Sequence, residues 1–184
     1  MRIQRCLSVG AVAALGAYAA APALAAPTIL NGGFEINASS IPVGGFTTVF
    51  ATNSTTIADW TVTQGSVDWV GTYWQAEQGI ASIDLSGDGE GKITQTITGL
   101  TKGDEYEISF WLAGNPDGAP SDKTGTIKVT ANGTAFKFAY PVTDQTHSDM
   151  DWIPETLDFT ATGKTTLLQF VSTRIRRTGR SSAM

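Results

Sequence analysis

The sequence predicts an all-β sandwich, and three observations support this prediction. Short runs rich in Thr, Val, Ile, Phe and Trp alternate with stretches of Gly, Asn, Asp and Pro, which is the pattern of strands separated by turns. After residue 25 there is no helical periodicity of useful length. Asn132-Gly133 lies between two strand-like runs and is a strong signal for a tight β-hairpin.

The expected strands follow one another from residue 46 to residue 171. In several of them apolar and polar residues alternate, as in residues 105–113, where Tyr106, Ile108 and Phe110 share one face. Successive strand residues point to opposite faces of a sheet, so this alternation gives the strand one buried face. The predicted strands are Phe46–Ala51, Ala58–Thr63, Ser66–Val70, Ile80–Leu85, Lys92–Thr98, Glu105–Ala113, Gly125–Ala131, Thr134–Tyr140, Trp152–Thr160 and Thr165–Val171.

Residues 1–25 are typical of a signal peptide. Arg2 and Arg5 form a short positive region, residues 7–21 are apolar without acids, and Ala23-Leu24-Ala25 matches the pattern that signal peptidase recognises. We expect cleavage after Ala25 and therefore a secreted or cell-surface protein. The apolar run is too short and too rich in small residues for a comfortable membrane span, which needs roughly 20 strongly apolar residues. No linker, charge run or repeat divides residues 26–173, which predicts one β-sandwich domain.

The exported chain is acidic. Of the 12 Lys and Arg, two lie in the signal peptide, whereas all 17 Asp and Glu lie after it, so the processed chain has a net charge of 10 − 17 = −7. A surface of this charge repels phosphate backbones, so nucleic acid is not an expected partner. It is compatible with neutral sugars and with divalent cations. The single cysteine, Cys6, lies in the signal peptide, so the processed chain has no disulfide and no thiol nucleophile.

Residues 174–184 differ in kind from the rest of the chain. They contain Arg174, Arg176, Arg177 and Arg180 and show no strand pattern. We interpret this basic tail as the product of a frameshift or a truncated gene model, and a genuine divergent tail is the alternative. A missing closing strand would leave a sheet edge open, and open edges promote aggregation.

Several segments resemble one known family. Asn31-Gly32-Gly33-Phe34-Glu35 resembles the N-x-x-F-E opening of jelly-roll carbohydrate-binding modules, and further likeness lies in residues 57–62, 65–75, 82–87 and 110–117. Together these segments look like the bacterial choice-of-anchor C proteins, exported relatives of the DUF642 group. The resemblance implies a jelly-roll β-sandwich with a galactose-binding-like fold, export to the cell surface or matrix, suspected sugar binding and no established enzyme activity.

An aromatic cluster is the first candidate for a ligand site. Trp60, Trp69, Tyr73 and Trp74 lie within fifteen residues, interleaved with acids and an amide. Sugar rings stack their C–H faces on flat indoles, and carboxylates and amides bind their hydroxyls. The alternative is that these aromatics fill the core, which we expect for Trp60 and Trp69, whereas both roles stay open for Trp74. The ligand-binding residues expected in a groove are Trp74, Tyr73, Asp68 and Asn115.

Asp84 and Glu35 are candidate ligands of a structural calcium ion. Asp84-x-Ser86-x-Asp88-Gly89 matches the first half of an EF-type loop, but its twelfth position is Gln95 instead of a bidentate Glu. An Asp/Gly-rich hairpin turn is the alternative for this segment. In the similar jelly rolls, the acid that corresponds to Glu35 helps to hold calcium with an acid from a final strand. That strand is not found here, so a surface or hydrogen-bonded carboxylate is the alternative for Glu35.

No catalytic residue is expected. His147 is the only histidine and lies in a polar loop beside Ser148, and nothing in the sequence resembles a nucleophile elbow. Acid pairs for glycoside hydrolysis can be drawn from 17 carboxylates almost at will, so no single pair is informative. We therefore expect a non-catalytic surface or matrix domain that binds polysaccharide or cell-wall glycan through an aromatic-lined groove. The alternative is a structural or adhesive surface domain with a protein partner and no sugar site.

Overall fold

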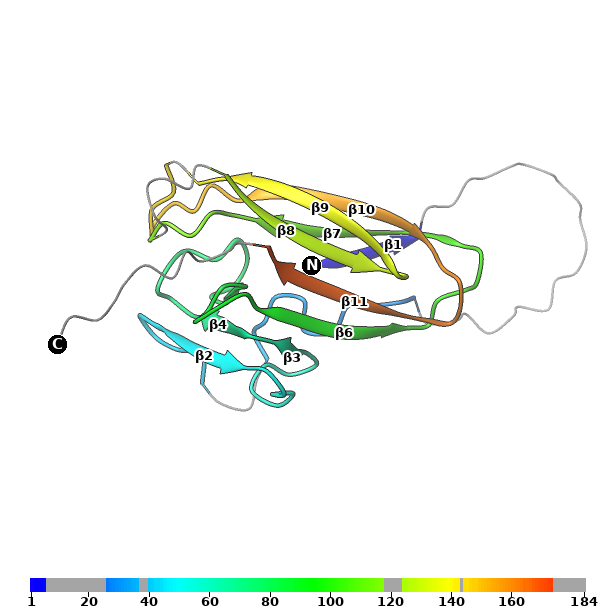
Figure 1. Ribbon diagram of the computed structural model, residues 1–184, viewed down its shortest axis with the longest axis horizontal. Helices are drawn as coiled ribbons and strands as arrows, with labels where there is room; N and C mark the ends of the chain where they lie inside the picture. Colours follow the sequence, from blue (N-terminus) through cyan, green and yellow to red (C-terminus); the bar gives the residue numbers. More distant parts are fainter. Residues whose placement is uncertain (6–25, 37–39, 118–123, 143, 174–184) are drawn as a thin grey trace, which may run out of the picture.

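The computed structural model describes residues 1–5, 26–36, 40–117, 124–142 and 144–173, which form an all-β protein (Figure 1). Every strand pair is antiparallel, and the described residues contain no helix. The predicted fold class is confirmed. The strands are β1 (Arg2–Arg5), β2 (Phe46–Phe50), β3 (Thr61–Gln64), β4 (Ser66–Val70), β5 (Ser82–Asp84), β6 (Lys92–Thr98), β7 (Glu105–Leu112), β8 (Thr124–Ala131), β9 (Thr134–Pro141), β10 (Ile153–Thr160) and β11 (Thr165–Ser172).

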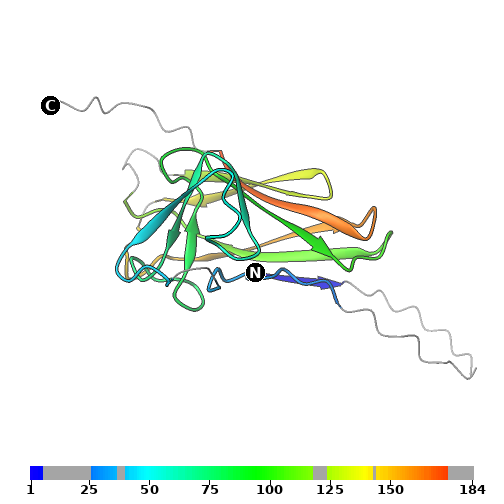
Figure 2. The same cartoon turned by 90° about the horizontal axis from the view of Figure 1, so that it is seen from below.

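The strands form one five-stranded sheet and two three-stranded sheets. The large sheet has the order β3-β6-β11-β8-β9, and the small sheets have the orders β1-β7-β10 and β2-β4-β5. The rings of Phe110 in β7 and Phe170 in β11 pack with centroids 5.3 Å apart, which shows that β7 faces β11 across the interior. Figures 1 and 2 show the layer that contains β7 and β10 facing the layer that contains β6 and β11. The arrangement is a β-sandwich.

The core is built from the faces that the alternating pattern predicts. In β7 the buried residues are Tyr106, Ile108 and Phe110, at every second position. Trp60 and Trp69 are 2% and 0% exposed, so the prediction that they are core residues is confirmed. Full burial of one large apolar side chain stabilises a fold by about 1.5–3 kcal/mol, so these residues are major contributors to stability.

The predicted strands agree with the observed ones except at some ends. The largest difference is in the predicted strand Ala58–Thr63, which begins only at Thr61. Asp59 has a φ of 66°, and the Trp60 N–H donates to the Ile57 carbonyl at 3.1 Å, so the chain turns here before it extends. Trp60 therefore enters the core from a turn and not from a strand.

Two predicted turns have different outcomes. The hairpin at Asn132-Gly133 is confirmed, because both residues have positive φ and β8 pairs with β9 directly across them. The segment after Asp84 is not a hairpin turn, because β5 pairs with β4 whereas β6 pairs with β3 and β11. It carries the chain from one sheet to another, and Asp84 Oδ1 accepts the Ser86 N–H within it at 2.8 Å. The hairpin interpretation of this segment is therefore wrong.

β1 is a strand that the sequence does not predict. It lies inside the predicted signal peptide and pairs with β7 from Tyr106 to Ser109. Residues 6–25, which include the rest of the predicted signal peptide, and the basic tail 174–184 lie outside the described residues. In the part of the chain that the structure describes, no helix is long and apolar enough to cross a membrane.

Gln95 fixes the N-terminal segment of the domain to β6. The residue is 6% exposed, and its side-chain Oε1 accepts the Leu30 N–H at 2.9 Å. Its Nε2 donates to the carbonyls of Leu30 and Asp59 at 2.8 and 3.0 Å. One buried amide thus binds three main-chain groups from two segments that have no strand partner at these points.

We predict that Gln95→Leu destabilises the fold. The leucine keeps most of the volume but leaves three main-chain groups without these partners, so the free energy of unfolding should fall by about 2–4 kcal/mol. Urea denaturation measures the change. The control Thr96→Val, at an exposed position of the same strand, should change it by less than about 0.5 kcal/mol. Equal effects of the two substitutions would contradict the role given to Gln95.

Candidate ligand-binding groove

The loop Asn31–Glu35 fixes two buried indoles. Trp60 Nε1 donates to the Asn31 carbonyl and Trp69 Nε1 donates to the Phe34 carbonyl, both at 3.1 Å. Phe34 has a φ of 62°, which is unusual for a bulky residue, and its ring packs on Trp60 with centroids 5.5 Å apart. The contacts on both tryptophans hold the loop in this conformation.

Glu35 connects this loop to the segment that enters β5. Its Oε1 accepts the N–H groups of Ile80 and Ala81 at 2.8 and 2.9 Å. Gly79 has a φ of 69°, and a Cβ at this position would collide with the Glu35 carboxylate. Glu35 therefore helps to position β5, and Asp84 is the last residue of that strand.

A cavity of about 80 Å³, which we call the polar cavity, brings three predicted site residues together. Trp74, Asp84 and Asn115 all line it. Asn115 Nδ2 donates to Asp84 Oδ2 at 2.7 Å, and Trp74 Nε1 donates to Ser82 Oγ at 2.8 Å. Apolar and aromatic side chains complete the wall, among them Trp111, Leu112, Tyr140, Met150 and Trp152. The cavity thus combines a carboxylate–amide pair with aromatic rings.

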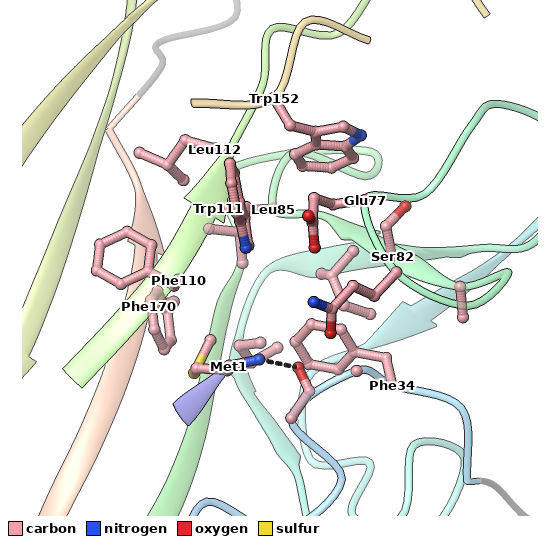
Figure 3. Close-up of a pocket in the computed structure, with 16 residues that line it drawn as sticks. Met1, Phe34, Glu77, Ser82, Leu85, Phe110, Trp111, Leu112, Trp152 and Phe170 are labelled. Atoms are coloured by element: carbon pink, nitrogen blue, oxygen red, sulfur yellow. Dashed lines mark hydrogen bonds between the residues drawn. The ribbon is translucent and has the colours of Figure 1, made fainter. Parts of the chain in front are cut away.

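A second cavity of about 130 Å³, the apolar cavity, adjoins the first. Figure 3 shows the rings of Phe110 and Phe170 on one side, Phe34 on the other, and Trp111 and Trp152 toward one end, with the carboxylate of Glu77 near them. The two cavities share the lining residues Ile83, Leu85, Trp111, Leu112 and Trp152. The two cavities are therefore neighbours, and we call them together the groove.

Trp111 and Trp152 belong to the groove but were not expected there. Trp111 is 41% exposed, and Trp152 Nε1 donates to the Gln75 carbonyl at 3.0 Å. In β7, Trp111 occupies the face whose other residues are Glu105, Glu107 and Ser109. A large aromatic in a polar row is the sequence signal that could have identified Trp111. No comparable signal marks Trp152.

Asp68 and Tyr73, two further predicted ligand-binding residues, do not line the groove. The register of β4 and β5 places Asp68 directly opposite Asp84, so Asp68 borders the polar cavity. Asp68 Oδ1 accepts the Thr48 hydroxyl at 2.7 Å. Tyr73 packs on Trp74 with ring centroids 5.8 Å apart and is itself partly exposed.

Tyr73, Asp117 and His147 form an exposed cluster next to the groove. The Tyr73 hydroxyl donates to Asp117 Oδ2 at 2.9 Å, and His147 Nε2 lies 2.9 Å from Asp117 Oδ1. The rings of Tyr73 and His147 have centroids 4.5 Å apart. The Asp117 N–H also donates to Asn115 Oδ1 at 2.8 Å. A chain of hydrogen bonds therefore links this cluster through Asn115 to Asp84 in the polar cavity.

The candidate calcium ligands have protein partners of their own. Glu35 accepts two main-chain N–H groups, Asp84 accepts from Asn115 and Ser86, and Gln95 binds the main chain. Calcium takes six to eight oxygen ligands. Across the described residues there is no group of three or more His, Cys, Asp or Glu side chains that could hold a metal ion. A calcium role for Glu35 and Asp84 stays a prediction, and no later step depends on it.

The fold and the groove define a β-sandwich protein with cavities lined by aromatic side chains. Residues 27–180 match the family described as "Protein of unknown function (DUF642)", and the chain belongs to this family. It is 32% identical over 142 residues to Halomucin from Haloquadratum walsbyi, a match that covers 77% of this chain and 2% of the length of Halomucin. Isomalto-dextranase of Arthrobacter globiformis T6, solved with panose, is a structural neighbour with a TM-score of 0.45 and 17% identity, covering 71% of this chain and 21% of that one.

We predict that the pKa of Tyr73 lies above the ordinary tyrosine value. Its pKa is raised first because its hydroxyl donates to Asp117, and further by desolvation and by the negative charge of Asp117. The raised pKa means that the fold favours the neutral phenol, so the contact stabilises the fold below the ordinary tyrosine pKa and is lost as pH rises through the raised value.

The measurement is the ultraviolet absorbance of the phenolate as a function of pH. The difference between the protein and its Tyr73→Phe variant isolates the titration of Tyr73 from that of the other tyrosines. In Asp117→Asn the pKa of Tyr73 should fall toward the ordinary value, because the negative acceptor is gone. An unchanged pKa in Asp117→Asn would contradict the assignment of this contact.

Proposed function

We propose that the processed chain is an exported, non-catalytic domain whose groove binds a segment of neutral polysaccharide. The observation that supports this most is the Asp84–Asn115 hydrogen bond of 2.7 Å in a cavity also lined by Trp74 and Trp111. Carboxylate and amide groups bind sugar hydroxyls, and flat aromatic rings pack on the apolar faces of sugars. A site with both kinds of group side by side is suited to a sugar ring.

The tryptophans have different roles in this proposal. Trp111 is 41% exposed, so one part of its ring is accessible as a stacking platform at the junction of the two cavities. Trp74 is 7% exposed and is held by Ser82, so it forms a wall of the polar cavity. Trp152, held by the Gln75 carbonyl, lines both cavities and offers a second aromatic surface.

Asn115 is positioned for a ligand by the protein itself. Its Nδ2 donates to Asp84 and its Oδ1 accepts the Asp117 N–H, which fixes the orientation of the amide plane. A fixed polar group binds a hydroxyl without first losing side-chain freedom, so preorganisation of this kind favours affinity. The contacts of Asp117 with Tyr73 and His147 support the same arrangement from the surface.

The charge of the domain favours a neutral ligand. Residues 26–173 contain six Lys, no Arg and all 17 acids, and the polar cavity itself contains Asp84. An anionic polymer would be repelled by this field, whereas a neutral glycan is insensitive to it. The likeness to choice-of-anchor C proteins and the signal-peptide pattern of residues 1–25 support a location at the cell surface or in the matrix.

The surroundings of His147 support a role without catalysis. Its ring contacts Tyr73 and Asp117, whereas the neighbouring Ser148 hydroxyl lies 3.3 Å from the Thr146 hydroxyl. A serine nucleophile needs a hydrogen bond to its histidine and a set of oxyanion donors. The contacts of His147 instead bridge surface loops, so we assign it a structural role.

Affinity electrophoresis against a panel of neutral cell-wall and extracellular glycans tests this function. The processed protein should be retarded by at least one glycan, and Trp111→Ala and Asn115→Ala should each weaken binding about tenfold, which corresponds to about 1.4 kcal/mol. Phe50→Ala is the matched control, because Phe50 is 58% exposed on β2 and does not line the groove. It should leave retardation unchanged.

The same gels run with EDTA separate sugar binding from a metal requirement, and we expect no effect of EDTA. A cooperative thermal transition of each variant shows that it is folded. Absence of retardation by any glycan in a folded protein, or equal weakening by Phe50→Ala and Trp111→Ala, would contradict the proposed function.

A further inference from the structure

The outer edge of β7 accepts an added strand. Figures 1 and 2 show β1 lying alongside β7, on the side of β7 opposite β10. The pairing is antiparallel and in one continuous register, which joins Arg2 to Ser109, Ile3 to Ile108, Gln4 to Glu107 and Arg5 to Tyr106. The backbone of β7 is therefore shaped to bind a short extended segment at this edge.

The predicted processing of the chain removes this strand, so the inference rests on the export that is part of the proposed function. Cleavage after Ala25 takes away β1 together with Met1, which lines the apolar cavity and whose amino group donates to the Gly32 carbonyl at 3.4 Å. The main-chain groups of Tyr106–Ser109 on this edge then lose the partner strand. An edge of this kind is a template for another extended segment.

The basic tail contains a close copy of β1. Arg174-Ile175-Arg176-Arg177 differs from Arg2-Ile3-Gln4-Arg5 only at the third position. If the tail adopted the register of β1, Ile175 would lie opposite Ile108, which is fully buried, and Arg176 would lie opposite Glu107. Strand register follows the apolar pattern, and the tail has its isoleucine at the position that pairs with Ile108, so the pattern favours the same register for the tail.

Charge makes the tail a better match for this edge than β1. On its other side, Glu107 lies directly opposite Asp158 of β10, and like charges opposite each other destabilise a strand pair. Arg176 in the position of Gln4 would put a positively charged residue opposite Glu107, whereas Gln4 is neutral. Hydrogen bonds between a guanidinium and a carboxylate are among the strong ones.

The tail that fills this edge must come from another molecule. β11 ends at Ser172 in the five-stranded sheet, whereas β7 belongs to the facing layer. Only Thr173 separates Ser172 from Arg174, so the chain advances at most about 7.6 Å in these two steps. Facing sheets pack roughly 10 Å apart. Arg174 of the same chain therefore cannot reach its place beside β7.

We propose that, after removal of the signal peptide, the β7 edge of one molecule binds residues 174–177 of a second copy as an added antiparallel strand. This proposal takes the tail as genuine, which is the alternative to a frameshift product. The edge and the tail are different surfaces of each molecule, so the contact is heterologous and repeats from head to tail. The result is a row of domains, each with its own groove, which presents many sugar sites to one polymer.

Sedimentation velocity of the processed protein, purified after export and measured over a range of concentrations, tests this assembly. The intact processed chain should form species larger than a monomer in increasing amounts, and a variant without residues 174–184 should stay monomeric. Arg176→Glu, which puts an acid opposite Glu107, should abolish the larger species. Arg180→Glu is the matched control, because it makes the same charge change outside the matching segment and should leave association intact.

Four results would overturn the inference: a monomeric intact chain at every concentration, association of the tail-less variant, equal effects of Arg176→Glu and Arg180→Glu, or a purified chain that still begins at Met1. A cooperative thermal transition shows that each variant is folded. Glycan retardation of the tail-less variant separates the two proposals, because no groove residue lies in the tail. Retardation without association contradicts only the assembly, and association without retardation contradicts only the sugar site.

Discussion

The structure depends on two buried indole hydrogen bonds, from Trp60 to the carbonyl of Asn31 and from Trp69 to the carbonyl of Phe34. A buried indole N–H without an acceptor costs about 1–3 kcal/mol, so the core accepts these tryptophans only if the loop Asn31–Glu35 lies against them. The loop in turn places Glu35 on the main chain before β5. The position of Asp84, and with it the polar side of the groove, follows from the packing of two core residues.

The groove and the pairing edge both depend on strand β7. β7 contributes Phe110, Trp111 and Leu112 to the groove at its carboxyl end, and it offers the pairing edge between Tyr106 and Ser109. The proposed sugar site and the proposed pairing edge therefore occupy neighbouring stretches of a single strand. β10 holds that strand in place over its whole length, because its pairing runs from Glu105 to Leu112.

The fold could be predicted because strand alternation is a local signal. β4 and β6 agree with their predicted bounds, since Gly and polar turn residues mark both ends. The approach of Trp74, Asp84 and Asn115 to one cavity depends on sheet pairing, which no local pattern encodes. We expected ligand roles for these residues because indole, carboxylate and amide groups bind sugars or metal ions. The contact between Asp117 and His147 was not predicted, because thirty residues separate them in the sequence. β1 escaped prediction because it consists of residues assigned to a signal peptide.

The most direct test of the sugar-binding groove is an indole N–H correlation spectrum of the ¹⁵N-labelled processed protein during titration with the best neutral glycan. The five tryptophans give five separate signals, which substitution by phenylalanine assigns. We predict that the signals of Trp111 and Trp152 shift with saturation, whereas those of Trp60 and Trp69, which are sealed in the core, do not. Saturable shifts confined to Trp60 and Trp69, or glycan binding that moves no indole signal, would contradict a site in the groove.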